Sequence, residues 1–151
     1  MVGHAGEFSE FFAEAEPRLR RALVAAYGPE RGREAAAEAL AYGWEHWSRI
    51  QRMTNPVGYL YRVGQSRGRP RKRRVLVDRS RPDEVWVEPR LEQALMKLTE
   101  RQRVATVLVH GFGWTLAEVA ELTGLSVTTI QNHLERGLQT LRTTLEVCED
   151  A

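Results

Sequence analysis

The sequence of 151 residues predicts an all-α protein made of two small helical domains joined by a basic, proline-containing linker. Three observations lead to this fold class. Apolar residues recur at helical spacing, and no long run alternates between apolar and polar residues as a half-buried strand would. Capping residues and glycines mark the helix ends. The segment 68–90 combines prolines with arginines and has no helical period, so we place domains at 1–67 and 91–147 around it.

The first domain is expected to hold three helices. The first covers 9–27 and should kink at Pro17, or start there, because proline lacks the backbone donor that a helix interior needs. The second covers 30–53 and is rich in alanine. Asn55-Pro56 opens the third, as an N-cap followed by proline at the first helical position. Pro70 should end it.

The second domain begins with a short helix lined by Leu91, Leu95 and Leu98. Thr99 is expected to cap the next helix, with Gln102 completing a capping box three residues later. Gly111-Phe112-Gly113 should then break that helix.

The segment 115–142 is predicted to be a helix-turn-helix. Thr115 and Glu118 form a second capping box, and Gly124 ends the first helix in a left-handed conformation. Ser126 caps the second helix, whose buried stripe consists of Ile130, Leu134, Leu138 and Leu141. The candidate DNA-binding residues of this recognition helix are Ser126, Thr128, Thr129, Gln131, Asn132, His133 and Arg136.

Glutamine and asparagine support a DNA-binding interpretation, because each can bond an adenine edge in the major groove through two hydrogen bonds. The alternative is an ordinary helical hairpin with a solvated polar face. We favour DNA binding because the capping residues, the glycine at the turn, the small Ala120 and the apolar spacing all indicate a helix-turn-helix over the same segment.

The charge of the chain is concentrated in one run. The formal net charge is only +2, yet the isoelectric point is near 9.0. The run contains no acidic residue and comprises Arg67, Arg69, Arg71, Lys72, Arg73 and Arg74. Such a run attracts polyphosphate by releasing its counterions. A solvated linker with no specific partner is the alternative, but beside a helix-turn-helix we favour nucleic acid.

Several classes of protein are not expected. No apolar run approaches the roughly 20 residues that span a bilayer, and the N-terminus lacks the basic start and apolar core of a signal peptide. We therefore expect a cytoplasmic protein without a membrane partner. The single cysteine excludes an intramolecular disulfide. The histidines His4, His46, His110 and His133 show no metal-ligand spacing, and no phosphate loop or nucleophile–base pair is visible. We expect no catalytic residue, metal or cofactor.

The second domain resembles the promoter-binding domain of bacterial RNA polymerase sigma factors of the small, two-domain extracytoplasmic-function type, in the sigma-70 family. The resemblance lies in 98–103, 116–120, 124–126, Thr129-Ile130 and 141–142. Output domains of response regulators share the local motif, and His133 fits them as well. The N-terminal half favours the sigma factor, because Asn55 to Val63 resembles the other sigma domain. A phosphoacceptor domain would need alternating strands and helices.

The resemblance implies that the chain binds core RNA polymerase and promoter DNA, with an anti-sigma factor as a further candidate partner. By this resemblance Glu34, Glu38 and Leu40 dock on the polymerase. The recognition helix would bind the upstream promoter element. Tyr59, Tyr61 and Arg62, followed by the basic run, would face the downstream element, where aromatic rings stack on unpaired bases. A place in the helical core is the alternative for these aromatics, and we favour it for Trp44.

The sequence also departs from the family pattern. The acidic docking stretch is reduced to Glu34-Ala-Ala-Ala-Glu38, and Gln131 and His133 stand where the family often carries Lys and Arg. We therefore hypothesise that the basic linker supplies much of the non-specific affinity for DNA. Two other functions are considered: a helix-turn-helix regulator that acts without polymerase, and a sigma-like module that binds proteins and touches DNA little.

Overall fold

The computed structural model describes residues 2–69 and 89–149, and every regular element in these two ranges is helical. The prediction of an all-α fold is confirmed. Of the predicted basic run, Arg71, Lys72, Arg73 and Arg74 lie outside the described residues. The N-terminal helices are α1 (Val2–Tyr27), α2 (Pro29–Glu45), α3 (Trp47–Ile50) and α4 (Pro56–Gly68). The C-terminal helices are α5 (Pro89–Met96), α6 (Glu100–Thr106), the π-helical η1 (Val107–Gly111), α7 (Leu116–Thr123) and α8 (Val127–Glu149).

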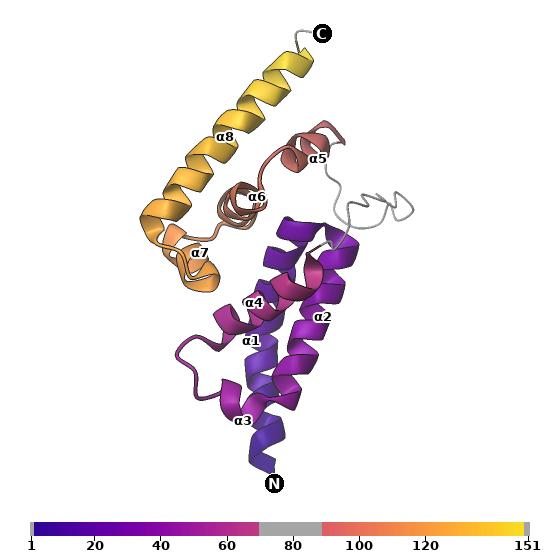
Figure 1. Cartoon of the computed structure of the whole chain (residues 1–151), viewed down its shortest axis with the longest axis vertical. Helices are drawn as coiled ribbons and strands as arrows, with labels where there is room; N and C mark the ends of the chain where they lie inside the picture. The colour runs from indigo at the N-terminus through magenta and orange to yellow at the C-terminus, as the bar shows by residue number, and fades with distance from the viewer. Residues whose placement is uncertain (1, 70–88, 150–151) are drawn as a thin grey trace.

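Helices α1 and α2 lie side by side, and α4 packs on both, at the lower end of the molecule in Figure 1. The expectation of a start at Pro17 is wrong, because α1 runs from Val2 to Tyr27 with Pro17 inside it. The missing backbone hydrogen bond is tolerated in a helix whose inner face is fully buried on both sides of the proline, at Ala15 and Leu19.

The helix starts that the sequence predicted are present. The Asn55 side chain accepts a hydrogen bond from the Gly58 N–H at 3.0 Å and caps α4. Both capping boxes form, one at Thr99 and the other at Thr115. Gly124 adopts the left-handed conformation with φ of 75°. Local chemistry therefore defines the ends of α4, α6 and α7.

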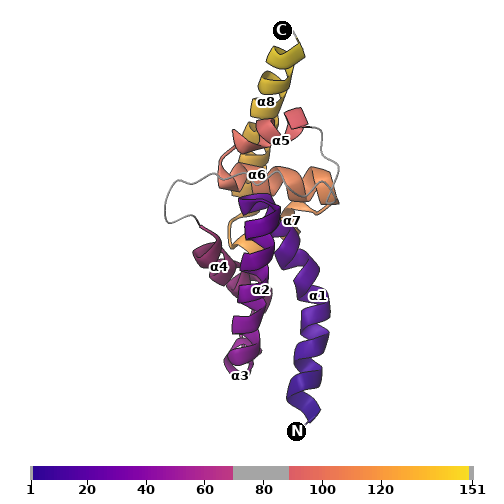
Figure 2. The same cartoon turned by 90° about the vertical axis from the view of Figure 1, so that its right-hand side faces the viewer.

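The two halves of the chain pack against each other instead of standing apart on a linker. Helix α6 lies across the C-terminal end of α1, as Figure 2 shows from the side. One continuous cluster of buried apolar residues extends from Ala15 of α1 to Ile130 of α8. A smaller separate cluster joins α5 and α8 through Ala94, Leu98 and Leu141. The sequence did not predict this shared core.

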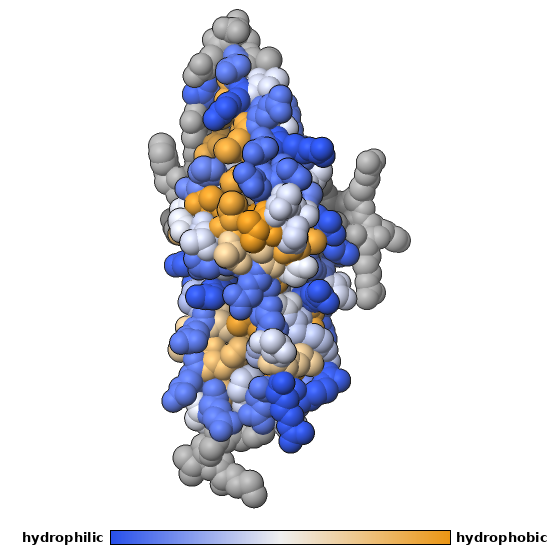
Figure 3. All heavy atoms as spheres, turned by 90° about the vertical axis from the view of Figure 1, so that its left-hand side faces the viewer, coloured by the Kyte–Doolittle hydropathy of each residue, from blue (hydrophilic) through white to orange (hydrophobic). Residues whose placement is uncertain are grey.

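Among the residues described, no helix has both the length and the apolar character that crossing a membrane requires. Within the same ranges no three or more His, Cys, Asp or Glu side chains gather into a group that could hold a metal ion. On the face shown in Figure 3, apolar side chains gather at mid-height, at the level of α7 and the start of α8.

Candidate nucleic-acid and polymerase interfaces

The start of α8 presents a polar face to solvent. Thr128, Gln131, Asn132 and Arg136 are exposed, and successive steps of three, one and four residues place them on one broad side of the helix. Ser126 is engaged in capping, since its Oγ accepts from the Thr129 N–H at 3.1 Å and lies 2.8 Å from the Thr129 Oγ1. The side chains beyond the cap are therefore available to a partner in this conformation.

His133 is placed differently from the other predicted recognition residues. Its Nε2 atom is buried and has no hydrogen-bond partner. Burial lowers the pKa of His133, and the positive charges of Arg101 and Arg136 lower it further. A neutral imidazole, half-buried between these arginines, offers little to a phosphate group.

Tyr59 belongs to a surface cluster that sequence reasoning missed. Its hydroxyl lies 3.4 Å from the Tyr42 hydroxyl, and the Arg49 guanidinium donates to Tyr42 at 2.8 Å. The His46 ring lies 4.3 Å from the Tyr42 ring. The hydrogen bonds from Tyr59 and then from Arg49 lower the pKa of Tyr42. Tyr42 belongs to α2 and Arg49 to α3, with a break at His46 between them, so no spacing within one helix reveals this cluster.

Tyr61 lies in the shared core, with only 2% of its surface exposed. It lines a cavity of about 250 Å³ together with Val104 of α6 and Val119 of α7. Burial is the main cause that raises the pKa of Tyr61. In this conformation Tyr61 cannot stack on a base, whereas Tyr59 is half-buried at the surface.

The arginines of α4 and its C-cap are exposed, and two of them form ion pairs. Arg67 lies 3.6 Å from Glu38, and Arg69 lies 3.9 Å from Glu100 of α6. Exposed pairs of this length contribute little to stability, so both arginines can exchange a carboxylate for a phosphate. Arg62 is exposed and lines the same cavity as Gly124.

The predicted polymerase-docking residues all lie on α2, but they differ in how far their side chains are exposed to solvent. Glu34 is exposed and Glu38 is half-buried, whereas Leu40 is buried at the base of a groove of about 480 Å³ between α1 and α2. Phe12 and Trp44 line this groove and are 42% and 51% exposed. The expectation that Trp44 is a core residue is therefore wrong, because the α1–α2 contact leaves its ring at the rim of the groove.

The chain is similar to known proteins in part of its sequence and in its fold. Residues 89–141 match the family described as Sigma-70, region 4. No curated protein matches the chain. Among solved structures, the sigma factor RpoE from Bartonella quintana, in complex with the anti-sigma factor NepR, superposes with a TM-score of 0.65 at 18% identity. The match covers 93% of this chain and 98% of that one.

The chain therefore shares the all-α fold of this sigma factor. Residues 89–141 are similar to region 4 of the sigma-70 family, in agreement with the resemblance noted in the sequence. The matched segment includes α5, α6, α7 and most of α8, so it contains the predicted helix-turn-helix up to residue 141.

Proposed function

We propose that this chain binds core RNA polymerase and directs it to promoters, with α8 reading the upstream promoter element. The region 4 domain and the exposed polar face of α8 support the proposal. In helix-turn-helix proteins the second helix lies in the major groove of DNA. The residues near its N-terminus contact the base edges. In this proposal the polymerase catalyses RNA synthesis and this chain has no catalytic role. Because both proposed partners are cytoplasmic, we propose the same location for this chain.

For the N-terminal half, we propose that the groove between α1 and α2 binds the polymerase. Phe12 and Trp44 expose apolar area beside Glu34 and Glu38. An apolar surface with a polar rim is the usual anatomy of a protein–protein interface. The similarity to a sigma factor that was solved with an anti-sigma factor supports such a protein as a further partner.

For DNA, we propose that Gln131 and Asn132 contact base edges and that Arg136 contacts phosphate. Tyr59, Arg62, Arg67 and Arg69 are the proposed contacts of the first half, and the basic run 71–74 is proposed to add non-specific affinity. Tyr61 and His133 stay candidates that need a change of conformation to become exposed.

The test is purification of the chain with bacterial core polymerase, followed by transcription from a genomic promoter library. Specific transcripts are expected, and they should be lost in Gln131→Ala while binding to core is retained. Glu146→Ala, a change at an exposed site further along α8, is the matched control. DNA binding without any affinity for core would instead indicate a stand-alone regulator. Binding to core without transcripts, and with weak DNA retention that does not depend on salt, would indicate an interaction module.

A further inference from the structure

The cavity of about 250 Å³ beside Tyr61 is lined by charged as well as apolar side chains. Three arginines and one glutamate line it, so the lining has a net charge of +2. Arg62 and Arg69 come from α4 and its C-cap, whereas Glu100 and Arg101 are the first two residues of α6. Like charges repel more strongly beside apolar walls than in water. A bound anion would relieve this repulsion.

Two of the three arginines lack a partner. Within 2–69 and 89–149, neither Arg62 nor Arg101 forms a hydrogen bond or an ion pair with another described residue. The Arg62 Nη2 lies against the turn after α7, 2.8 Å from where a Cβ on Gly124 would stand. A cation is favoured at this helix end, yet its donors bond no carbonyl of the described chain. Both guanidinium groups are therefore free to bind a ligand.

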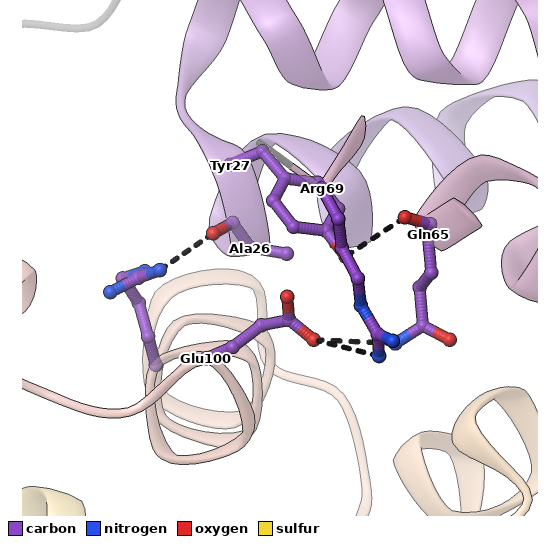
Figure 4. Close-up of polar contacts among 6 residues, drawn as sticks. Ala26, Tyr27, Gln65, Arg69 and Glu100 are labelled. Atoms are coloured by element: carbon purple, nitrogen blue, oxygen red, sulfur yellow. Dashed lines mark hydrogen bonds and ion pairs between the residues drawn. The ribbon is translucent and has the colours of Figure 1, made fainter. Parts of the chain in front are cut away.

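The third arginine shares a carboxylate at long distance. Figure 4 shows Glu100 pointing from α6 toward Arg69 and Gln65, at 3.9 Å and 3.4 Å. Both distances are longer than the roughly 2.7–2.9 Å of a charge-assisted hydrogen bond. Glu100 thus sits among the positive charges without forming a close ion pair. An anion that makes shorter bonds to Arg69 can take its place.

The position of α6, which carries Glu100 and Arg101, is fixed by a further arginine. The Arg103 guanidinium donates to the carbonyls of Ala25 at 2.9 Å and Ala26 at 2.6 Å, at the end of α1. It also donates to the Leu98 carbonyl, after α5, at 3.1 Å. Because α4 packs on α1 as well, the walls of the cavity are in place before a ligand binds. Such preorganisation lowers the entropic cost of binding.

The size and charge of the cavity indicate the class of ligand. Pockets for drug-sized molecules and cofactors enclose roughly 300–1,000 Å³, and this cavity is smaller. Arginine binds phosphate groups through two parallel N–H···O bonds. Once Glu100 is displaced, three positive charges remain, more than the charge of about −1.5 to −2 on one phosphate group. A small anion with two phosphate groups matches both the size and the charge.

We propose that this cavity is a binding site for inorganic diphosphate. Arg62 and Arg101 bind the anion with their free guanidinium groups, and Arg69 exchanges Glu100 for it. The site is additional to the DNA and polymerase surfaces proposed above. Since Arg62 and Arg69 are also proposed DNA contacts, bound diphosphate competes with DNA phosphates for them. This consequence rests on the proposed function, whereas the site itself does not.

The test is isothermal titration calorimetry of the full chain with sodium diphosphate, at constant ionic strength and without divalent cations. Saturable binding is expected. Phosphate and sulfate should bind at least about tenfold more weakly, because each lacks the second group. ADP carries its diphosphate on a nucleoside that the cavity is too small to enclose, so it should also bind more weakly. Tighter binding of ADP would overturn inorganic diphosphate as the ligand in favour of a nucleotide.

Two variants with matched controls locate the site. Arg101→Gln should weaken diphosphate binding about tenfold, whereas Arg142→Gln removes the same charge from an exposed position outside the cavity and should have little effect. Glu100→Gln removes the competing carboxylate and should tighten binding about threefold. Glu121→Gln, an exposed site on α7 outside the cavity, is its control. Should Arg101→Gln fail to fold by circular dichroism, Glu100→Gln decides the question.

No saturable binding at about 1 mM diphosphate would overturn the proposal. So would equal losses of affinity in Arg101→Gln and Arg142→Gln, because binding would then depend on the overall charge and not on the cavity. Unchanged or weaker binding in Glu100→Gln would show that its carboxylate does not compete with the ligand, which also contradicts the site. The titrations contain neither DNA nor polymerase, so their result is independent of whether the proposed function holds.

Discussion

Gly32 of α2 lies directly against Val24 of α1, so closely that a Cβ atom on residue 32 would overlap the backbone N and Cα of Val24. The two helices begin their antiparallel packing at this point, immediately after the turn at Gly28. Backbone atoms cannot swing aside as the end of a flexible side chain can, so any larger residue must push the helices apart.

Gly32→Ala should therefore lower the free energy of unfolding by about 1–3 kcal/mol, the usual cost of overpacking. Urea denaturation followed by circular dichroism measures the change. Gly6→Ala is the matched control, because no heavy atom lies within 4 Å of its added Cβ. In an exposed helix that change should stabilise by up to about 1 kcal/mol. Equal effects of the two substitutions would contradict the assigned contact.

The Thr115 capping box should contribute measurably to the helix-turn-helix. Its hydroxyl accepts from the Glu118 N–H at 3.1 Å, and its own N–H donates to the Glu118 carboxylate at 3.2 Å. We expect Thr115→Ala to cost about 1 kcal/mol of stability. Thr143→Ala on the exposed side of α8 should change stability little, since its hydroxyl only bonds back to Gln139 within the helix. Thermal melting of both variants provides the comparison.

Arg136 should contribute to DNA affinity through one phosphate contact. Arg136→Ala is expected to weaken promoter binding and to reduce the slope of log affinity against log salt by about one unit. Arg142→Ala removes an equal charge from the same helix at a position about 240° further round. The salt slope should stay unchanged there. A reduced slope for Arg142 and none for Arg136 would place the DNA on the other side of α8.

His133 should make stability depend on pH. Its pKa is lowered in the folded chain by burial, Arg101 and Arg136, whereas the unfolded chain titrates near 6.5. The unfolded state therefore binds the proton first, and stability should fall as the pH drops below about 6.5. Melting temperatures from pH 8 to pH 5 should decline less steeply in His133→Gln than in the parent chain. Parallel curves would show that His133 is not desolvated in solution.

The sequence predicted those parts of the fold that depend on neighbours within a few residues. The caps at Asn55, Thr99 and Thr115 and the left-handed Gly124 lie where their side-chain chemistry places them. The polar face of α8 follows from the same helical periodicity. These features need no knowledge of tertiary packing, because each donor and acceptor lies within one helical turn.

Features that depend on distant residues were not predictable in this way. Arg103 and Ala25 are separated by 78 residues, and no local pattern indicates that an arginine in a helix serves two helix ends. Tyr61 was expected at a DNA surface by resemblance, yet α6 and α7 cover it. The exposure of Trp44 likewise depends on where α1 crosses α2. For these residues the packing of whole helices, rather than local propensity, decides the environment.

Helix α8 is long and packs against α6 near its middle. At Gly137 it approaches α6 so closely that a Cβ atom would lie 2.6 Å from the Thr106 hydroxyl. The helix continues from there for about 18 Å at 1.5 Å per residue, away from the α1–α2 pair (Figure 1). A rotation of about 10° at Gly137 would displace its end by roughly 3 Å, taking α5 along through the Leu141 cluster. A partner that binds the end of α8 would therefore act on the contact between α8 and α6 at Gly137.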